Sequence, residues 1–224
     1  MTHGTDDAPV RGRQRLAGAA FMVSGLGLVV HIVVGLPLWI TVPGGLVLVV
    51  ALLAWVGALT GLDLRPVLVP GATAGVLATV AYDLSRIAAV KVLGSDLQPF
   101  EAWRFFGAAL VGESASLTAR WAAGGLFHVI NGVAFALAYT VWFGRRGPVA
   151  GIAWGLFLEA FMLGLYPGWL VISAYRPFLA VSLIGHVAYG ATLGVTARAL
   201  LRRGDRAGPT PDALRVRGGG ADGG

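Results

Sequence analysis

Long apolar runs separated by short polar segments make up most of the chain. A helix needs at least about 17 residues to cross the hydrocarbon core of a membrane. Six runs reach that length, at about 16–40, 46–62, 66–93, 121–143, 148–171 and 178–201. The pattern therefore predicts an all-α fold, a polytopic membrane bundle of six transmembrane helices within a domain over residues 16–203.

Polar segments mark where these spans begin and end. Residues 1–15 are polar and basic, which is typical of a cytoplasmic arm. A Pro-Gly-Gly sequence in residues 41–45 predicts a tight turn between the first two spans. Residues 204–224 are rich in Gly, Pro and Asp and cannot bury enough apolar surface to become ordered, so we expect a disordered cytoplasmic tail.

One segment between the third and fourth spans is amphipathic and aromatic. Residues 99–111 combine Phe100, Trp103 and further phenylalanines with Glu101 and Arg104. This pattern indicates a short helix lying in the membrane interface, where it would cover whatever opens on that side. An ordinary aromatic membrane anchor is the alternative.

Composition supports a membrane protein. Hydrophobic residues make up 56% of the chain and charged residues only 12%, against about 25% charged residues in soluble domains. The chain has no cysteine, which excludes disulfides, thiolate metal sites and cysteine nucleophiles. Its arginines cluster beside apolar runs, so we expect membrane lipids as partners and no nucleic acid.

The distribution of basic residues predicts the orientation. Cytoplasmic loops of membrane proteins carry more Lys and Arg than external ones. With the N-terminus inside, the inner side receives Arg11, Arg13, Arg15, Arg65, Arg145, Arg146, Arg202, Arg203 and Arg206. The outer loops receive Arg104, Arg120 and Arg176, with Lys91 at their border. We therefore expect a multi-pass inner-membrane protein with both termini cytoplasmic. A cleavable signal peptide is not expected, because the first apolar run is as long as a span.

Ionisable residues interrupt four of the spans at a similar depth. They are Asp83, His128, Glu159 and His186. With the rise of a helix, each lies roughly 10–18 Å below the outer boundary. Charged groups in hydrocarbon cost at least about 2.5–3.5 kcal/mol on insertion scales, so they usually face the protein interior and mark function. The sequence predicts that these groups meet in an outward-facing polar pocket.

Further polar residues share faces with these groups. Asn131 lies three residues after His128, and Tyr166 lies seven after Glu159. Ser182 and Tyr189 share the stripe of His186. We assign Asn131, Tyr166, Ser182, Tyr189 and Arg86 to ligand binding. Arg86 follows Asp83 by three residues, so the two can also form an ion pair, with Arg86 extending to the interface.

Two classes of function fit this pocket. The favoured one is binding, or proton-linked handling, of a small hydrophobic or protonatable molecule. The alternative is a membrane-embedded enzyme acting on a lipid-soluble substrate such as an isoprenoid. In that enzyme Glu159 or Asp83 would be a protonated general acid, with His128 or His186 as the base or orienting group. A purely structural role is the background alternative.

A metal or haem site is a further alternative. His31, His128, His186 and Glu159 offer imidazole and carboxylate ligands, which suit zinc or iron. However, no HxxxH or HxxE spacing puts two ligands on one helix, so we assign no metal ligand. The sequence leaves the cofactor and the oligomeric state open.

The C-terminal three spans resemble a known family. The resemblance lies in residues His128–Tyr139, in Trp154 and Gly155, and in Gly185–Gly190 followed by terminal arginines. These short motifs, over roughly the last 80 residues, are similar to those of small bacterial inner-membrane proteins of the YagU type. The resemblance implies an inner-membrane protein linked to acid tolerance. It does not extend to Glu159, Asp83 or Arg86.

Overall fold

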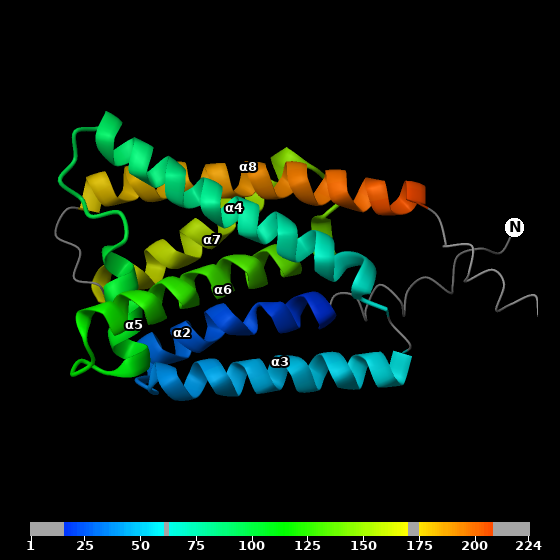
Figure 1. The fold of residues 1–224 in the computed structure, drawn as a ribbon, viewed down its shortest axis with the longest axis horizontal. Coiled ribbons are helices and arrows are strands. Elements are labelled where there is room, and N and C mark those ends of the chain that lie inside the picture. The colour runs from blue at the N-terminus through cyan, green and yellow to red at the C-terminus, as the bar shows by residue number, and fades with distance from the viewer. Residues whose placement is uncertain (1–15, 61–62, 170–174, 208–224) are drawn as a thin grey trace, which may run out of the picture.

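The computed structural model describes residues 16–60, 63–169 and 175–207, and these residues form helices and no strands (Figure 1). This confirms the all-α fold predicted from the sequence. The helices are α2 (Val23–Val34), α3 (Leu38–Thr60), α4 (Arg65–Val92), α5 (Glu101–Val111), α6 (Leu117–Phe143), α7 (Pro148–Trp169) and α8 (Tyr175–Ala207).

Five of these helices are long and apolar enough to cross a membrane, namely α3, α4, α6, α7 and α8. They are the helices of a multi-pass membrane protein. α2 is shorter, but residues 16–21 before it are also helical. Met22, which joins the two, keeps a right-handed helical backbone with φ −74° and ψ −12°.

The first turn lies earlier in the chain than the sequence predicts. The break falls at residues 35–37, and the expected turn at 41–45 is part of α3, with Pro43 inside the helix. Gly35 closes α2 with φ 78°, a left-handed conformation that glycine adopts at little cost, and its N–H donates to the carbonyl of His31. Pro37 then directly precedes α3, where a missing N–H does no harm. Gly35 and Pro37 therefore end and restart the helix, and Pro43 only removes one hydrogen bond.

Two other expected boundaries can be compared with the structure. α6 begins at Leu117, four residues before the expected start, because the Ser116 hydroxyl accepts a hydrogen bond from the Ala119 N–H at 3.2 Å and caps the helix. The expected helix at 99–111 is present as α5. Its position in a membrane interface stays a prediction.

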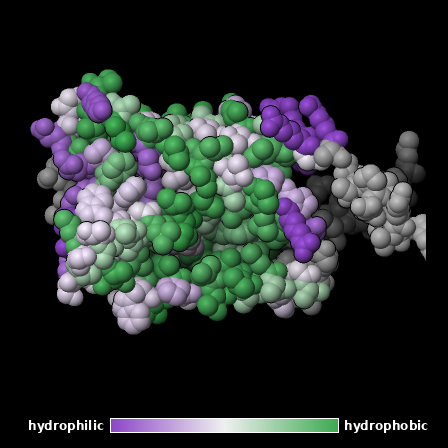
Figure 2. Space-filling model, in the orientation of Figure 1, coloured by the Kyte–Doolittle hydropathy of each residue, from purple (hydrophilic) through white to green (hydrophobic). Residues whose placement is uncertain are grey.

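Successive long helices run in opposite directions, and α5 lies across one end of the bundle (Figure 1). The start of the described chain and the end of α8 lie together at the opposite end. Hydrophobic residues cover the middle of the visible face and hydrophilic residues gather at its two ends (Figure 2). This division is the one that a membrane imposes on a bundle that crosses it.

Glycines bring the helix backbones of α7 and α8 into direct contact. A Cβ atom on Gly151 would lie 2.0 Å from the carbonyl oxygen of Gly190, and one on Gly155 would lie 2.2 Å from that of His186. Small residues allow this approach in membranes, where apolar burial alone does not drive helices together. The α7–α8 contact thereby fixes the position of His186 relative to α7.

Candidate functional site

A buried histidine–carboxylate pair joins α7 and α8. Nδ1 of His186 lies 2.7 Å from Oε2 of Glu159, with side-chain exposures of 11% and 3%. The Ser182 hydroxyl donates to the same Oε2 at 2.8 Å. Nδ1 also lies 3.0 Å from the Ser182 carbonyl oxygen, which can only accept. Nδ1 therefore carries the ring proton, and Nε2 is the nitrogen left for other chemistry.

A second histidine–carboxylate pair joins α4 and α6. Nε2 of His128 lies 3.1 Å from Oδ1 of Asp83, and the two side chains are 18% and 20% exposed. The ion pair between Asp83 and Arg86 that their spacing allows is not formed, since α6 offers Asp83 a histidine. The side chain of Asp83 thus links α4 to α6, instead of pairing with Arg86 one turn further along α4.

Tyr82 connects the two pairs. Its ring centroid lies 5.6 Å from that of His128 and 5.0 Å from that of His186. On its other side His128 meets Trp103 of α5, at 5.4 Å between ring centroids. The four ionisable groups predicted to converge are thus held as two pairs about one tyrosine. Tyr82 and Trp103 were not predicted from the sequence as part of the site. For Tyr82, its place next to Asp83 was the available signal.

Arg86 points into the bundle. Its residue exposure is 8%, and its Cζ atom lies 5.1 Å from the centroid of the Tyr82 ring. A Cβ on Gly185 would meet its Cγ at 2.9 Å, so the stem lies against α8. The expectation that Arg86 reaches the interface is therefore wrong, because the glycine makes room for it between α4 and α8. Its Nε is buried without a hydrogen-bond partner in the described chain.

The other residues expected to bind a ligand are Tyr189, Asn131, Ser182 and Tyr166, and their surroundings differ. The Tyr189 hydroxyl donates to the Gly132 carbonyl oxygen at 2.6 Å, which ties α8 to α6. Oδ1 of Asn131 is buried and has no partner among the described residues. Ser182 holds Glu159, as described above. The side chain of Tyr166 lies outside the part of the chain that the structure describes.

A cavity of about 300 Å³ lies beside these groups. Its polar lining comes from α4, α5, α6 and α8: Thr79, Tyr82, Arg86, Trp103, His128, Asn131, Ser182, His186 and Tyr189. Its apolar lining comes mainly from α2 and α7 and includes Met22, Leu26, Val29, Phe157, Leu158 and Phe161. Both histidines line the cavity, whereas their carboxylate partners do not. The lining of the cavity thus combines polar groups from α4, α5, α6 and α8 with apolar side chains that come mainly from α2 and α7.

The cavity reaches the outside of the bundle on its apolar side. Leu26 of α2 and Phe157 and Phe161 of α7 line it, yet they are 53%, 52% and 53% exposed. These three half-exposed apolar side chains form the rim of the cavity on α2 and α7.

His31 does not join the site. Its Nδ1 lies 2.8 Å from the Leu36 carbonyl oxygen, and its ring meets Trp169 edge-on at 5.7 Å. Among the described residues, no three histidine or acidic side chains come together as a metal site. The ligand set of three histidines and Glu159 considered above is thus not assembled.

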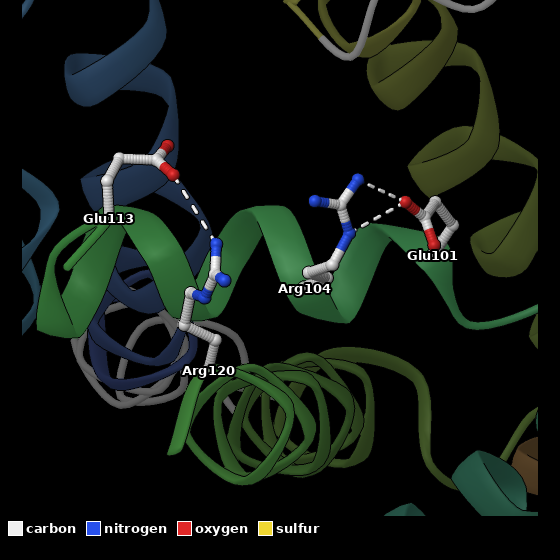
Figure 3. Close-up of polar contacts among 4 residues, drawn as sticks. All are labelled: Glu101, Arg104, Glu113 and Arg120. Carbon is white, nitrogen blue, oxygen red and sulfur yellow. Dashed lines mark hydrogen bonds and ion pairs between the residues drawn. The ribbon is translucent and has the colours of Figure 1, made fainter. Parts of the chain in front are cut away.

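Charged residues of α5, of the loop after it and of the first turn of α6 form two pairs (Figure 3). Arg104 donates from Nε to Oε1 of Glu101 at 2.8 Å, and Arg120 of α6 lies 3.4 Å from Glu113. α5 packs closely on α6, since a Cβ on Gly124 would lie 1.8 Å from the Trp103 carbonyl oxygen. These contacts hold Trp103 over His128.

Comparison with known proteins places this site within a family. Residues 65–207, which include α4 to α8, match the model of a family of unknown function, DUF6789. The matched part contains both histidine–carboxylate pairs and Arg86. No curated protein and no solved structure matches the chain significantly. The chain belongs to the DUF6789 family.

Proposed function

We propose that this member of a family of unknown function binds a lipid-soluble small molecule in the cavity, and that its two histidine–carboxylate pairs couple binding to protons. One observation carries the proposal: His128 and His186 line a single cavity of about 300 Å³ whose lining is otherwise mostly apolar. Ligand sites of this size are mostly apolar with a few convergent polar groups. Histidine changes charge between about pH 5 and 8, which suits a proton-linked site.

The rim of the cavity supports access from the membrane. A ligand dissolved in lipid would pass between α2 and α7, over Leu26, Phe157 and Phe161. Its apolar part would then rest on these two helices, and its polar part would reach α4, α6 and α8. This route needs no opening at the polar ends of the bundle.

The topology proposed for this function is six spans in the inner membrane with both termini cytoplasmic. The helical run over residues 16–34 is roughly 28 Å long at the rise of an α-helix, close to the thickness of a membrane core. Arg65 begins α4, Arg145 and Arg146 lie between α6 and α7, and Arg202 lies in the last turns of α8, whereas His128 of the second pair meets Trp103 of α5. This arrangement supports an outward-facing site, and the likeness to the YagU type stays a prediction.

Single cysteines test the topology directly, because the natural chain has none. Ser114→Cys in the loop after α5 should react with a membrane-impermeant maleimide in intact cells. Gly204→Cys near the end of α8 should react only after the membrane is permeabilised. The reverse pattern would show that the protein has the opposite orientation in the membrane. Equal reaction of both sites in intact cells would contradict the six-span topology.

Filling the cavity tests binding. Val29 lines the cavity on α2, whereas Val47 lies on the exposed side of α3 with an exposure of 69%. Val29→Trp should abolish saturable binding of radiolabelled decanol to the purified protein, and Val47→Trp should leave it unchanged. Equal binding by both variants would show that the alcohol binds elsewhere.

Proton coupling is tested by pH. The affinity for the probe should change about threefold or more between about pH 5 and 8, where histidines titrate. The double variant His128→Gln and His186→Gln should bind with an affinity that no longer depends on pH. Asp83, Glu159, Tyr82 and Arg86 stay in place in this variant, so a pH dependence that persists would come from them and contradict coupling through the histidines.

A membrane enzyme is the second candidate, and the state of His186 favours it. Nδ1 of His186 is bound to Glu159, and no described residue binds Nε2. A histidine oriented by a carboxylate, with its other nitrogen at a cavity, is arranged as a general base. In this function Glu159 positions His186. Glu159→Gln would then retain ligand binding and lose turnover. Loss of pH-dependent uptake into vesicles, without any turnover in the wild type, would instead favour transport.

A further inference from the structure

Arg86 is the group that the proposed function leaves unexplained. It is 8% exposed and lines the cavity, and its buried Nε has no hydrogen-bond partner within the described chain. The carboxylates of the site pair with the histidines: Oδ1 of Asp83 lies 3.1 Å from His128, and Oε2 of Glu159 lies 2.7 Å from His186. A guanidinium has five donors and remains charged at all physiological pH values.

When both histidines are protonated, the charges of the described groups around the cavity do not balance without a ligand. Each histidine–carboxylate pair is neutral as a whole when its histidine is protonated. Arg86 then remains as the uncompensated charge of the described groups about the cavity. A buried charge without a partner is strongly unfavourable, and burial strengthens its attraction for an anion.

We infer that the ligand is an amphipathic monoanion whose head group binds Arg86, an inference that rests on the proposed function of the cavity. Trp103 lines the cavity, and its Nε1–H is buried without a partner in the described chain. Asn131 also lines it with an unpaired Oδ1, and its amide offers an NH₂ group when turned over. Arg86, Trp103 and Asn131 thus supply donors to one anionic head.

The surroundings select the charge and shape of this ligand. Asp83 and Glu159 stand behind the histidines and would repel a second negative charge, which disfavours a dianionic phosphate ester. The apolar wall on α2 and α7 accepts an alkyl chain. The simplest ligand with both properties is a carboxylate on an apolar tail, such as a medium-chain fatty acid.

The anion also determines the direction of the pH effect. Binding a negative charge favours protonation of His128 and His186, which face the cavity from α6 and α8. Asp83 on α4, Glu159 on α7 and the neutral Tyr82 are the other titratable groups packed against them. The affinity for a carboxylate should therefore rise as the pH falls from 8 to 6, a range in which carboxyl groups with a pKa of about 4–5 remain ionised.

Three probes of equal chain length test the inference on the full-length protein in nonionic detergent. They are radiolabelled decanoate, decanol and decylamine. Wild-type protein should bind decanoate at least tenfold more tightly than decanol, since hydrogen bonds to a charged group are the strong ones, and decylamine more weakly than both. Decanoate that binds no better than decanol would overturn the anionic ligand and leave the proposed function in place. Failure of all three to bind would overturn both.

Variants of Arg86 locate the head group. Arg86→Gln should weaken decanoate binding about tenfold and change decanol binding less than twofold. Arg86→Lys should recover part of the loss. Arg146→Gln, at the exposed opposite end of the bundle, is the matched control and should bind both probes normally. Equal losses for the acid and the alcohol in Arg86→Gln would assign Arg86 to packing. If that variant does not fold, the comparison of probes on the wild type still decides.

Discussion

The α2–α3 hairpin and the body formed by α4, α6, α7 and α8 are both apolar, yet they use apolar residues differently. In α3 only 6% of the most hydrophobic window is buried, against 44% in α8. A Cβ on Gly57 of α3 would meet nothing within 4 Å, whereas one on Gly151 of α7 would meet the backbone of α8. The apolar side chains of α3 are mostly exposed, as expected of a helix that faces lipid. In the body, small residues allow the helices to pack directly against one another.

The two regions also differ in polar content. The hairpin carries His31, which hydrogen-bonds to a carbonyl of its own turn and meets the ring of Trp169 edge-on. The body carries both histidine–carboxylate pairs and Arg86, and the family match begins at α4. The hairpin adds an apolar wall to the cavity through α2. The division suggests that the chemistry is contained in the body and that α2 shapes access to it.

Breaking the buried pair should give the largest effect. Glu159→Ala removes the acceptor of the Ser182 hydroxyl and of Nδ1 of His186 in the dry interior of the body. Removal of one partner from a buried pair costs about 3–5 kcal/mol. We expect a loss of this size in the free energy of unfolding, measured by denaturant titration in detergent micelles. A loss below about 1 kcal/mol would mean that water reaches the pair.

Gly151→Ala and Gly57→Ala compare the two regions with the same substitution. The Gly151 variant should lose about 1–3 kcal/mol, because its methyl group overlaps the Gly190 carbonyl at 2.0 Å. The Gly57 variant should be as stable as the wild type or more stable by up to about 1 kcal/mol, since alanine favours a helix. Equal stability of the two variants would contradict the close contact of α7 and α8.

Tyr189→Phe tests a single link between helices of the body. The variant leaves the Gly132 carbonyl without the hydroxyl that bonds it at 2.6 Å. Net contributions of such hydrogen bonds are about 1 kcal/mol, and the free energy of unfolding should fall by that amount. Binding of decanol should persist, because the tyrosine ring that lines the cavity is retained. A variant as stable as the wild type would show that the link is replaceable.

His31→Ala should have the smallest effect. The hydrogen bond to Leu36 is exposed, so its loss should cost less than about 0.5 kcal/mol. Neither binding of decanol nor its pH dependence should change. A change in the pH dependence of decanol binding would show that the hairpin takes part in the chemistry of the site. It would contradict the difference between the two regions.

The sequence predicted the helical class and the meeting of the ionisable groups for one physical reason. Hydrocarbon penalises charge, so Asp83, His128, Glu159 and His186 had to turn inward at a shared depth. In the structure, Gly190 and Gly194 of α8 lie against Gly151 and Gly147. These predictions depend on periodicity and depth, which a single sequence contains.

The wrong predictions concern alternative side-chain partners and alternative turn positions. Only the packing of the folded chain decides between them. Asp83 could pair with Arg86 along α4 or with a residue of another helix, and spacing alone does not show that His128 lies within reach. The turn was placed at Pro43 and not at Gly35 because both sequences favour a break, and the left-handed conformation of Gly35 becomes visible only in the folded chain. Tyr82 was missed because a tyrosine inside a span also fits an ordinary packing residue of the core.

Photolabelling with a saturable ligand tests the central claim most directly. A decanoate that carries a diazirine at the end of its tail should label α2 and α7 near Leu26, Phe157 and Phe161, and excess unlabelled decanoate should abolish this labelling in a protein reconstituted in zwitterionic lipid. Background labelling of α3 should not respond to the competitor. Labelling that is spread over α3 and α7 alike, and that no competitor reduces, would contradict a cavity that takes its ligand from the membrane.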